Sequence, residues 1–124
     1  MKIIFLILPI FLLSDDSFIT NLEYGEMLYK NPRGIGCIKC HGKNGKGKVI
    51  AIYLDDKTGR KKKLIAPNIK NINYKTFYYR IKKLKILKKG KWRKIYYSIM
   101  PKYNYLVDEE IKAIYNYLHK KDNK

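Results

Sequence analysis

The stretch Cys37-Ile38-Lys39-Cys40-His41 decides how the rest of this 124-residue chain is interpreted. Two thiols stand three residues apart, and an imidazole follows the second thiol directly. In a Cys-x-x-Cys-His pattern the thiols can add to the two vinyl groups of one porphyrin edge, while the next residue brings an imidazole to the iron. The pattern therefore predicts one covalently attached haem c, held by Cys37 and Cys40, with His41 as an iron ligand.

Two other kinds of site also use closely spaced cysteines. A thioredoxin-like dithiol places its first cysteine at a helix N-terminus after a buried strand, and no such strand pattern precedes Cys37. A zinc site needs four ligands, which here would be Cys37, Cys40, His41 and the distant His119. That spacing does not match a zinc finger, so haem is favoured and the dithiol and zinc stay as alternatives. A disulfide is disfavoured, because so short a loop constrains the unfolded chain little.

The second axial ligand of a haem iron in an electron carrier is often methionine, which raises the reduction potential. Met100 is the favoured candidate, because Pro101 follows it and takes it out of regular helix. Met27 falls inside an expected helix, where core packing is the better explanation. His119, in a lysine-rich C-terminal segment, is the rival ligand.

The chain is strongly basic, with 28 Lys and Arg against 10 Asp and Glu and a formal charge of +18. This favours an acidic partner, which could be a protein face, an anionic membrane surface or nucleic acid, although lysine-rich composition without a functional role is an alternative. The apolar run Ile3–Leu13 follows Lys2 as in a secretory signal and is too short for a membrane span. We expect residues 1–17 to be a signal peptide or an uncleaved anchor and residues 18–124 to form one domain.

Local patterns predict a mostly α chain with long connections. The expected elements are a helix over 21–30 with a capping box, a glycine-rich loop over 33–48, a possible small β-hairpin at about 49–65, a helix from Tyr74 that ends by Gly90, a short helix over 91–99, and a last helix from Asp108 to Leu118.

Taken together, these segments resemble the class I monohaem cytochromes c from roughly Leu22 to Leu118. The motifs that carry the resemblance are Gly25-Glu26-Met27-Leu28-Tyr29, the haem motif with Gly42, Ala66-Pro67-Asn68, Met100-Pro101-Lys102-Tyr103, and Asp108-Glu109-Glu110-Ile111 leading to Tyr117-Leu118.

The resemblance implies a cytochrome c-like fold, in which the first and last helices cross near the haem edge. Gly25 would allow the close approach to Tyr117 at that crossing. The resemblance also implies that the carbonyl of Pro67 accepts the second imidazole N–H of His41. Pro67 thereby joins Cys37, Cys40, His41 and Met100 as a predicted cofactor-binding residue.

Three features depart from the family pattern. Val107 stands where Ser or Thr often caps the last helix, so Asp108 would have to cap it or the helix would begin less firmly. The stretch 48–65 is long for a small cytochrome, and we expect it to cover the haem or to present a partner surface. Trp92 is expected to pack in the protein, with contact to a haem propionate as the alternative.

The resemblance implies a monomeric periplasmic carrier of single electrons and not an enzyme, because two filled axial positions leave no room for a substrate. A tether to the inner membrane through residues 1–17, or association with a membrane surface, is compatible with this. Acidic redox proteins, by analogy a bc-type complex, a haem-copper oxidase or a di-haem peroxidase, would be the partners, and not nucleic acid. The alternatives are a basic nucleic-acid or anionic-surface binding module that uses Tyr74–Tyr97, and a haem enzyme or gas sensor with an open iron position.

Overall fold

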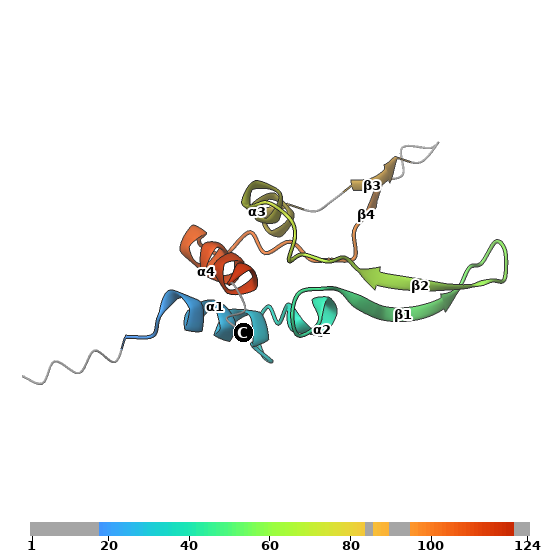
Figure 1. Cartoon of the computed structure of the whole chain (residues 1–124). Helices are drawn as coiled ribbons and strands as arrows, with labels where there is room; N and C mark the ends of the chain where they lie inside the picture. The colour runs from blue at the N-terminus through green and yellow to red at the C-terminus, as the bar shows by residue number, and fades with distance from the viewer. Residues whose placement is uncertain (1–17, 84–85, 90–94, 121–124) are drawn as a thin grey trace, which may run out of the picture.

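The computed structural model describes residues 18–83, 86–89 and 95–120, so the expected leader over residues 1–17 and Trp92 lie outside the described residues. The elements in chain order are α1 (Asn21–Lys30), α2 (Ile38–His41), β1 (Lys48–Leu54), β2 (Lys61–Ala66), α3 (Tyr74–Lys82), β3 (Ile86–Lys89), β4 (Ile95–Tyr97) and α4 (Asp108–His119). The helices gather into one body, and the β1–β2 hairpin extends away from it (Figure 1). Within the described ranges, none of the helices has the length and apolarity that a membrane span needs.

Helix α1 has the predicted bounds, and the predicted capping box is present at its start. The hydroxyl of Thr20 accepts the backbone N–H of Glu23 at 3.2 Å, and the Glu23 carboxylate accepts the backbone N–H of Thr20 at 2.7 Å. The backbone and hydroxyl of Thr20 both donate to this carboxylate and lower the pKa of Glu23, because they stabilise its ionised form. The local pattern alone therefore determines where this helix begins.

Helix α4 also forms where the sequence predicted it, but its start differs from the expected cap. The N-cap residue is Val107, whose side chain cannot accept a hydrogen bond, and Asp108 is the first helical residue. The Glu110 carboxylate accepts the backbone N–H of Val107 at 2.9 Å, which is half of a capping box. Asp108 accepts the hydroxyl proton of Tyr78 from α3 at 2.9 Å, so it links two helices and does not cap.

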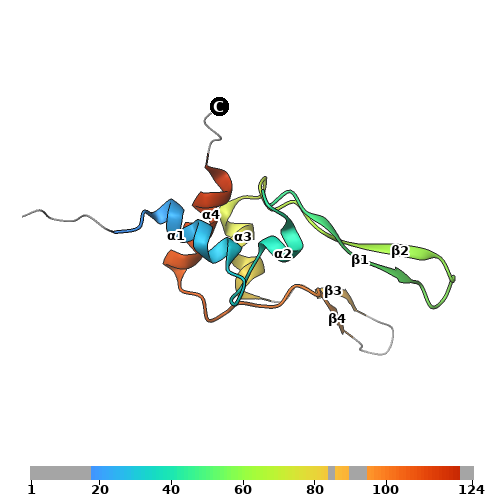
Figure 2. The same cartoon turned by 90° about the horizontal axis from the view of Figure 1, so that it is seen from below.

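The crossing of α1 over α4 confirms the predicted contact between the first and last helices (Figure 2). A Cβ added to Gly25 would lie 2.0 Å from the carbonyl oxygen of Ala113 and 3.0 Å from Cβ of Tyr117. Only a residue without a side chain allows the two backbones to come this close. Next to this contact, the rings of Tyr29 and Tyr117 pack with their centroids 5.6 Å apart.

The apolar core lies between α1, α3 and α4. Its buried members are Tyr29, Phe77, Ile81, Leu106, Ile111, Ile114, Tyr117 and Leu118. Helix α3 joins through aromatic contacts, since the ring of Tyr115 on α4 meets Tyr74 and Phe77 edge-on at 5.2 and 5.4 Å. These contacts occupy two of the four α3 aromatics on which a nucleic-acid binding surface would have depended.

The predicted hairpin at 49–65 is confirmed as the antiparallel pair β1–β2, with a β-bulge between Val49 and Ala51. Asp55 shapes the turn, because its carboxylate accepts the backbone N–H groups of Lys57 and Thr58 at 3.0 Å each. Gly59 completes the turn with φ of +63°.

The predicted helix from Tyr74 to Gly90 is wrong for the described residues after Lys82, and the predicted helix over 91–99 is wrong where the structure describes it. Helix α3 ends at Lys82, and β3 pairs with β4 in a second antiparallel hairpin. The apolar spacing of Ile81, Leu84 and Leu87 fits a helix, but isoleucine and tyrosine at 86 and 95–97 also favour strands. Pairing between the two segments decided the outcome, and helical spacing carries no information about that pairing.

Candidate functional site

A cavity of about 770 Å³ opens between the helical body and the base of the two hairpins. Four stretches of chain line it, and most of the lining side chains are apolar. They are Ile35, Cys37 and His41; Tyr53, Leu64 and Ile65; Pro67, Asn68, Ile69, Ile72, Thr76, Phe77, Arg80 and Ile81; and Ser98, Ile99, Met100, Tyr103 and Leu106. Its volume and apolar walls suit a large flat organic cofactor.

His41 is the one buried polar residue of the described body, with 6% of its surface exposed. It ends the short helix α2 and lines the cavity. Its Nδ1 lies 2.9 Å from the carbonyl oxygen of Pro67. Because a carbonyl only accepts, Nδ1 carries the proton and Nε2 keeps a free lone pair for a metal. This is the hydrogen bond that the family resemblance implied.

The loop after α2 holds His41 against the Pro67 segment through two glycines. The N–H of Gly47 donates to the carbonyl of His41 at 2.9 Å, and the N–H of Ile69 donates to the carbonyl of Gly45 at 2.8 Å. A Cβ at Gly47 would lie 2.2 Å from the carbonyl oxygen of Ala66, and its φ is +83°. Close approach and a left-handed backbone both require glycine here, as the glycine-rich sequence predicted.

The two cysteines are not placed alike. Cys37 is half-buried and lines the cavity, whereas Cys40 is exposed and is not among the residues that line it. Burial raises the pKa of the Cys37 thiol to about 11. A thioredoxin-like dithiol needs a cysteine with a lowered pKa, so the environment of Cys37 disfavours that alternative.

The zinc alternative fails on geometry. Among the described residues, no three His, Cys, Asp or Glu side chains are grouped so that they could hold a metal ion. His119 lies away from the cysteines, with its ring stacked on Tyr115 at 3.8 Å and its Nδ1 2.8 Å from the carbonyl oxygen of Tyr115.

The structure brings one of the candidate second ligands to the cavity of His41. Met100 is half-buried and lines the cavity, and its N–H donates to the hydroxyl of Ser98 at 3.3 Å. Met27 projects from α1 with 58% of its surface exposed. Neither Met27 nor His119 lines the cavity.

Two further polar residues, to which the sequence analysis gave no role at the haem, also line the cavity. Arg80 is the one Lys or Arg in its lining, and no hydrogen bond or ion pair with a described residue engages its guanidinium. Tyr103 is half-buried, its N–H donates to the carbonyl of Ile81 at 2.6 Å, and burial raises its pKa. The position of Arg80 three residues after Phe77 and next to Ile81 could have indicated the cavity side.

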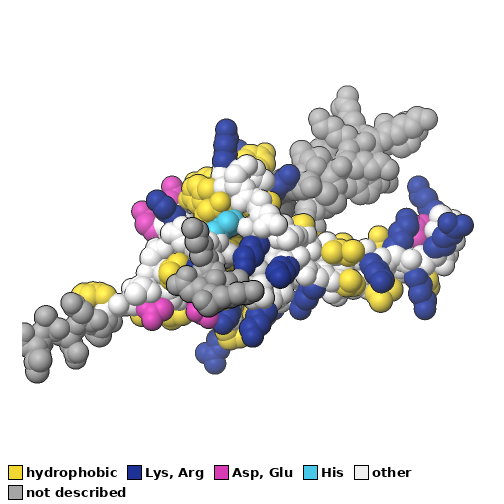
Figure 3. Space-filling model, viewed as in Figure 1, with side chains coloured by type: hydrophobic (Ala, Val, Ile, Leu, Met, Phe, Trp, Pro, Cys, Tyr) yellow, Lys and Arg dark blue, Asp and Glu magenta, His cyan; other side chains and the backbone are white. Residues whose placement is uncertain are grey.

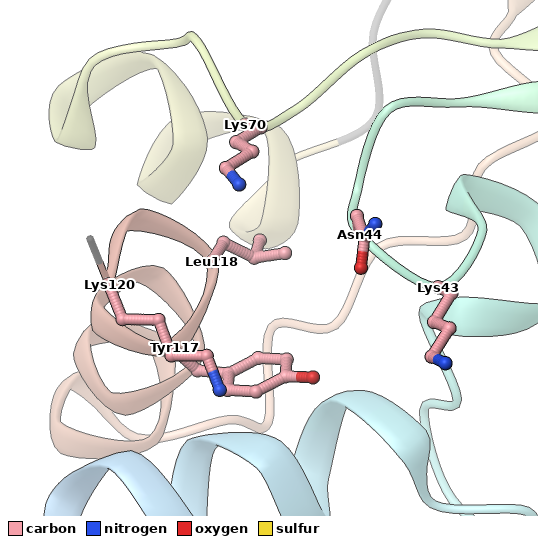
Figure 4. Close-up of a pocket in the computed structure, with 6 residues that line it drawn as sticks. All are labelled: Lys43, Asn44, Lys70, Tyr117, Leu118 and Lys120. Carbon is pink, nitrogen blue, oxygen red and sulfur yellow. The ribbon is translucent and has the colours of Figure 1, made fainter. Parts of the chain in front are cut away.

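A second hollow lies at the C-terminal end of α4 and holds only about 30 Å³, which is room for about one water molecule. Figure 4 shows its lining, formed by Lys43, Asn44, Lys70, Tyr117, Leu118 and Lys120. The ammonium of Lys120 lies 4.7 Å from the centroid of the Tyr117 ring. This hollow is too small for a cofactor, so the larger cavity is the candidate site.

The residues present fit a haem c. Thiol, imidazole and thioether side chains stand on one apolar cavity, and the guanidinium of Arg80 offers a charge partner for a carboxylate.

Comparison with models of protein families agrees with this fit. The Cytochrome c family model matches residues 22–122, which is most of the chain. Comparisons with curated proteins and with solved structures each gave no match. The chain therefore belongs to the cytochrome c family, whose members carry a covalently bound haem c and transfer electrons.

Proposed function

We propose that this cytochrome c carries single electrons between respiratory complexes in the periplasm, on one haem c held in the 770 Å³ cavity. The observation that supports this most is the placement of His41 and Met100 on the same cavity, with Nδ1 of His41 hydrogen-bonded to Pro67. That bond fixes the imidazole ring and leaves Nε2 free to act as a ligand.

The residues of the haem motif and Met100 each have a role in this proposal. The thiols of Cys37 and Cys40 would attach the haem, and Nε2 of His41 and the thioether of Met100 would hold its iron. Cys40 serves in this way if its exposed side chain turns to the cavity edge. When bound, the haem supplies one electron site, as its iron alternates between the ferric and ferrous states.

The surroundings of the ligands favour a carrier over an enzyme. Met100 would hold the iron together with His41 and would leave it no free site for a substrate. The apolar walls, among them Ile35, Ile69 and Phe77, exclude water and disfavour the more highly charged ferric state. The thioether ligand raises the potential in the same direction.

Arg80 is the residue that we expect to hold a haem propionate. A half-buried guanidinium with no charged partner among the described residues carries a desolvation cost, and a carboxylate in the cavity would relieve it. Arg80→Gln should shift the reduction potential of the haem. In detergent, the haem of this variant should leave its cavity more easily, although it stays covalently attached to the chain. Arg60→Gln, at the exposed turn of the β1–β2 hairpin, is the matched control and should change neither.

The charge of +18 supports an acidic partner face. Electrostatic attraction would speed the encounter with such a face, and added salt would slow it. A bc-type complex as donor, and a haem-copper oxidase or di-haem peroxidase as acceptor, are the partner classes that we propose. Electron-transfer rates with each, measured across a range of salt concentrations, test this.

Attachment is tested by export of the chain in cells with the haem-attachment machinery, followed by haem staining of a denaturing gel. The intact protein should stain, and Cys37→Ala combined with Cys40→Ala should remove the stain. Cell fractionation and N-terminal sequencing of the same material test the periplasmic location and the fate of residues 1–17. A colourless but folded intact protein would sink the proposal.

The second ligand is tested separately with carbon monoxide. Met100→Ala should open the ferrous iron, raise its affinity for carbon monoxide strongly and change its spectrum. Met27→Ala and His119→Phe are the controls and should leave both unchanged. If Met100→Ala changes neither the carbon monoxide affinity nor the spectrum, Met100 is not a ligand of the iron. The iron then has another second ligand or an open position, and the haem enzyme or gas sensor becomes the better hypothesis.

A further inference from the structure

The two faces of the β1–β2 hairpin have different surroundings. Ile52 pairs with Lys63 and Leu54 pairs with Lys61, and directly opposite residues of an antiparallel pair share a face. We call these four residues the outer hairpin face. Tyr53 points to the other side because side chains alternate along a strand, and it lines the haem cavity.

The outer hairpin face has no described part of the protein packed against it. Ile52 and Leu54 expose 62% and 61% of their surfaces, although both are large aliphatic residues on a regular strand. Figure 3 shows the protruding arm with basic side chains close to apolar ones along its length. A regular strand with an uncovered apolar row is unusual, and natural proteins normally protect one.

The charges on the hairpin are mostly unopposed. Residues 48–66 hold six Lys or Arg and two Asp, a net charge of +4. One of the acids, Asp55, is already paired with Lys62, which lies opposite Tyr53 and so is not on the outer face. Within the described part of the chain, Lys61 and Lys63 have no ion-pair partner. The outer face therefore joins exposed aliphatic groups to free ammonium groups.

We propose that the outer hairpin face docks on a membrane surface that contains anionic phospholipid. Ile52 and Leu54 would enter the region between headgroups and acyl chains. The stems of Lys61 and Lys63 would lie along the same apolar boundary, with their ammonium groups on lipid phosphates. A second copy of this chain is a poor occupant, because it would bring +18 against +18. Docking would hold the proposed carrier on the surface where membrane-bound partners lie, a consequence that rests on the proposed function.

The apolar part is tested with the full chain, haem-loaded and purified from exporting cells, by cosedimentation with phosphatidylcholine vesicles with and without a quarter of phosphatidylglycerol. We expect binding to the anionic vesicles that falls about tenfold in the Ile52→Ser, Leu54→Ser double variant. Ile19→Ser with Val107→Ser removes two other exposed apolar side chains, 56% and 54% exposed, and should change binding little. The N-terminus is the same in every arm, so a difference reports on the hairpin.

The charge part uses the same vesicles. Lys61→Gln with Lys63→Gln should weaken binding about thirtyfold, since each lysine near an anionic surface contributes about 1 kcal/mol. Lys75→Gln with Lys112→Gln removes the same charge from exposed positions on α3 and α4, and its loss should be several times smaller. Equal losses in the two pairs would show that only net charge matters and would overturn the proposal.

Tryptic cleavage at Lys61–Lys63, followed by mass spectrometry, locates the contact. Anionic vesicles should protect these bonds, and neutral vesicles should not. Soluble polyglutamate is the control for a polyanion. If it protects these bonds as well as anionic vesicles do, both in the intact chain and in the Ile52→Ser, Leu54→Ser variant, the face is a site for a polyanion or an acidic protein and the lipid proposal is overturned. Binding that the hairpin variants leave intact would do the same. Haem staining of every variant should stay normal, so failure here is distinct from failure of the haem proposal.

Discussion

The helical body and the β1–β2 hairpin are held together in opposite ways. In the body, Tyr29, Ile111 and Ile114 are fully buried where α1 crosses α4. In the hairpin, all seven residues of β1 are exposed. The body owes its stability to contacts within the chain, whereas the hairpin is held by its own strand pairing and turn, and the side chains of β1 stay exposed.

This difference predicts how substitutions act in each region. A buried contact in the body constrains which residue can stand there, because packed interiors tolerate neither added nor lost volume well. An exposed apolar side chain on the hairpin contributes little to the stability of the free protein, because folding buries little of its surface. Substitutions in the body should therefore lower stability, and matched substitutions in the hairpin should change binding.

The largest effect is expected from Gly25→Leu. The carbonyl of Ala113 lies where the first atom of any side chain would go, and a backbone carbonyl cannot rotate away. We expect the free energy of unfolding to fall by at least about 4 kcal/mol, above the usual cost of overpacking, as measured by denaturant unfolding of the haem-loaded protein. Gly59→Asn is the control in the hairpin turn, where nothing lies within 4 Å and asparagine tolerates the positive φ. A loss under about 1 kcal/mol for Gly25→Leu would mean that α1 does not cross α4 here.

The next effect compares two isoleucines. Ile114→Ala removes a side chain with 0% exposure from the core and should cost about 3 kcal/mol through lost burial and a cavity. Ile52→Ala makes the same chemical change at a residue that is 62% exposed and should stay within about 0.5 kcal/mol. Denaturant midpoints with unchanged slopes give both values. A cost above about 1.5 kcal/mol for Ile52→Ala would show that the hairpin is covered within the free protein.

The body could be predicted from sequence because its signals are local. The capping box of Thr20 and Glu23, and the amphipathic spacing of Ile111, Ile114 and Leu118, lie within single helices. The β3–β4 hairpin could not be predicted, because its apolar residues fit both a helix and a strand and only the pairing of Ile86 with Tyr97 separates the two. No single-segment pattern contains that information.

The candidate site divides in the same way. Adjacent residues with shared chemistry, such as the cysteines and His41, identify the haem motif by their spacing alone. The partner of His41, the carbonyl of Pro67, required the family resemblance, since a backbone oxygen leaves no mark in the sequence. Arg80 was missed because the charged face of a helix is taken for basic surface until the neighbouring chain segments are placed around it. Groups that meet at the site from distant positions in the chain are thus the part that the sequence predicts least.

A moderate effect is expected from Tyr29→Phe. The hydroxyl of the buried Tyr29 donates to the carbonyl of Gly42 at 2.6 Å and ties α1 to the loop after His41. Burial raises the pKa of Tyr29, so the phenol stays protonated as a donor. Its removal should cost about 1.5 kcal/mol and should speed amide exchange in residues 42–47. Tyr53→Phe in the hairpin loses a hydroxyl with no hydrogen-bond partner among the described residues and should leave stability unchanged. Equal costs would contradict the distinction between the two regions.

The smallest effect concerns pH and the hairpin turn. The bond from Lys62, together with the backbone N–H groups of Lys57 and Thr58, lowers the pKa of Asp55 from 3.8 to about 2. Because the folded pKa is the lower one, the contribution of Asp55 is complete above about pH 4 and is lost as the pH falls toward 2. Glu23 and Glu26 in α1 also have lowered pKa values, so global unfolding against pH cannot isolate the turn.

Amide exchange in β1 and β2 isolates the turn from the rest of the molecule. Protection from exchange there, relative to the rate of an unfolded chain at the same pH, should fall below about pH 4 in the wild type, and Asp55→Asn should remove that step while the protection of α4 stays the same. A carboxyl titration of Asp55 centred near pH 4, its ordinary range, would mean that the turn is open in solution. The outer hairpin face would then lose the rigid strand pairing that aligns its lysines with its aliphatic residues.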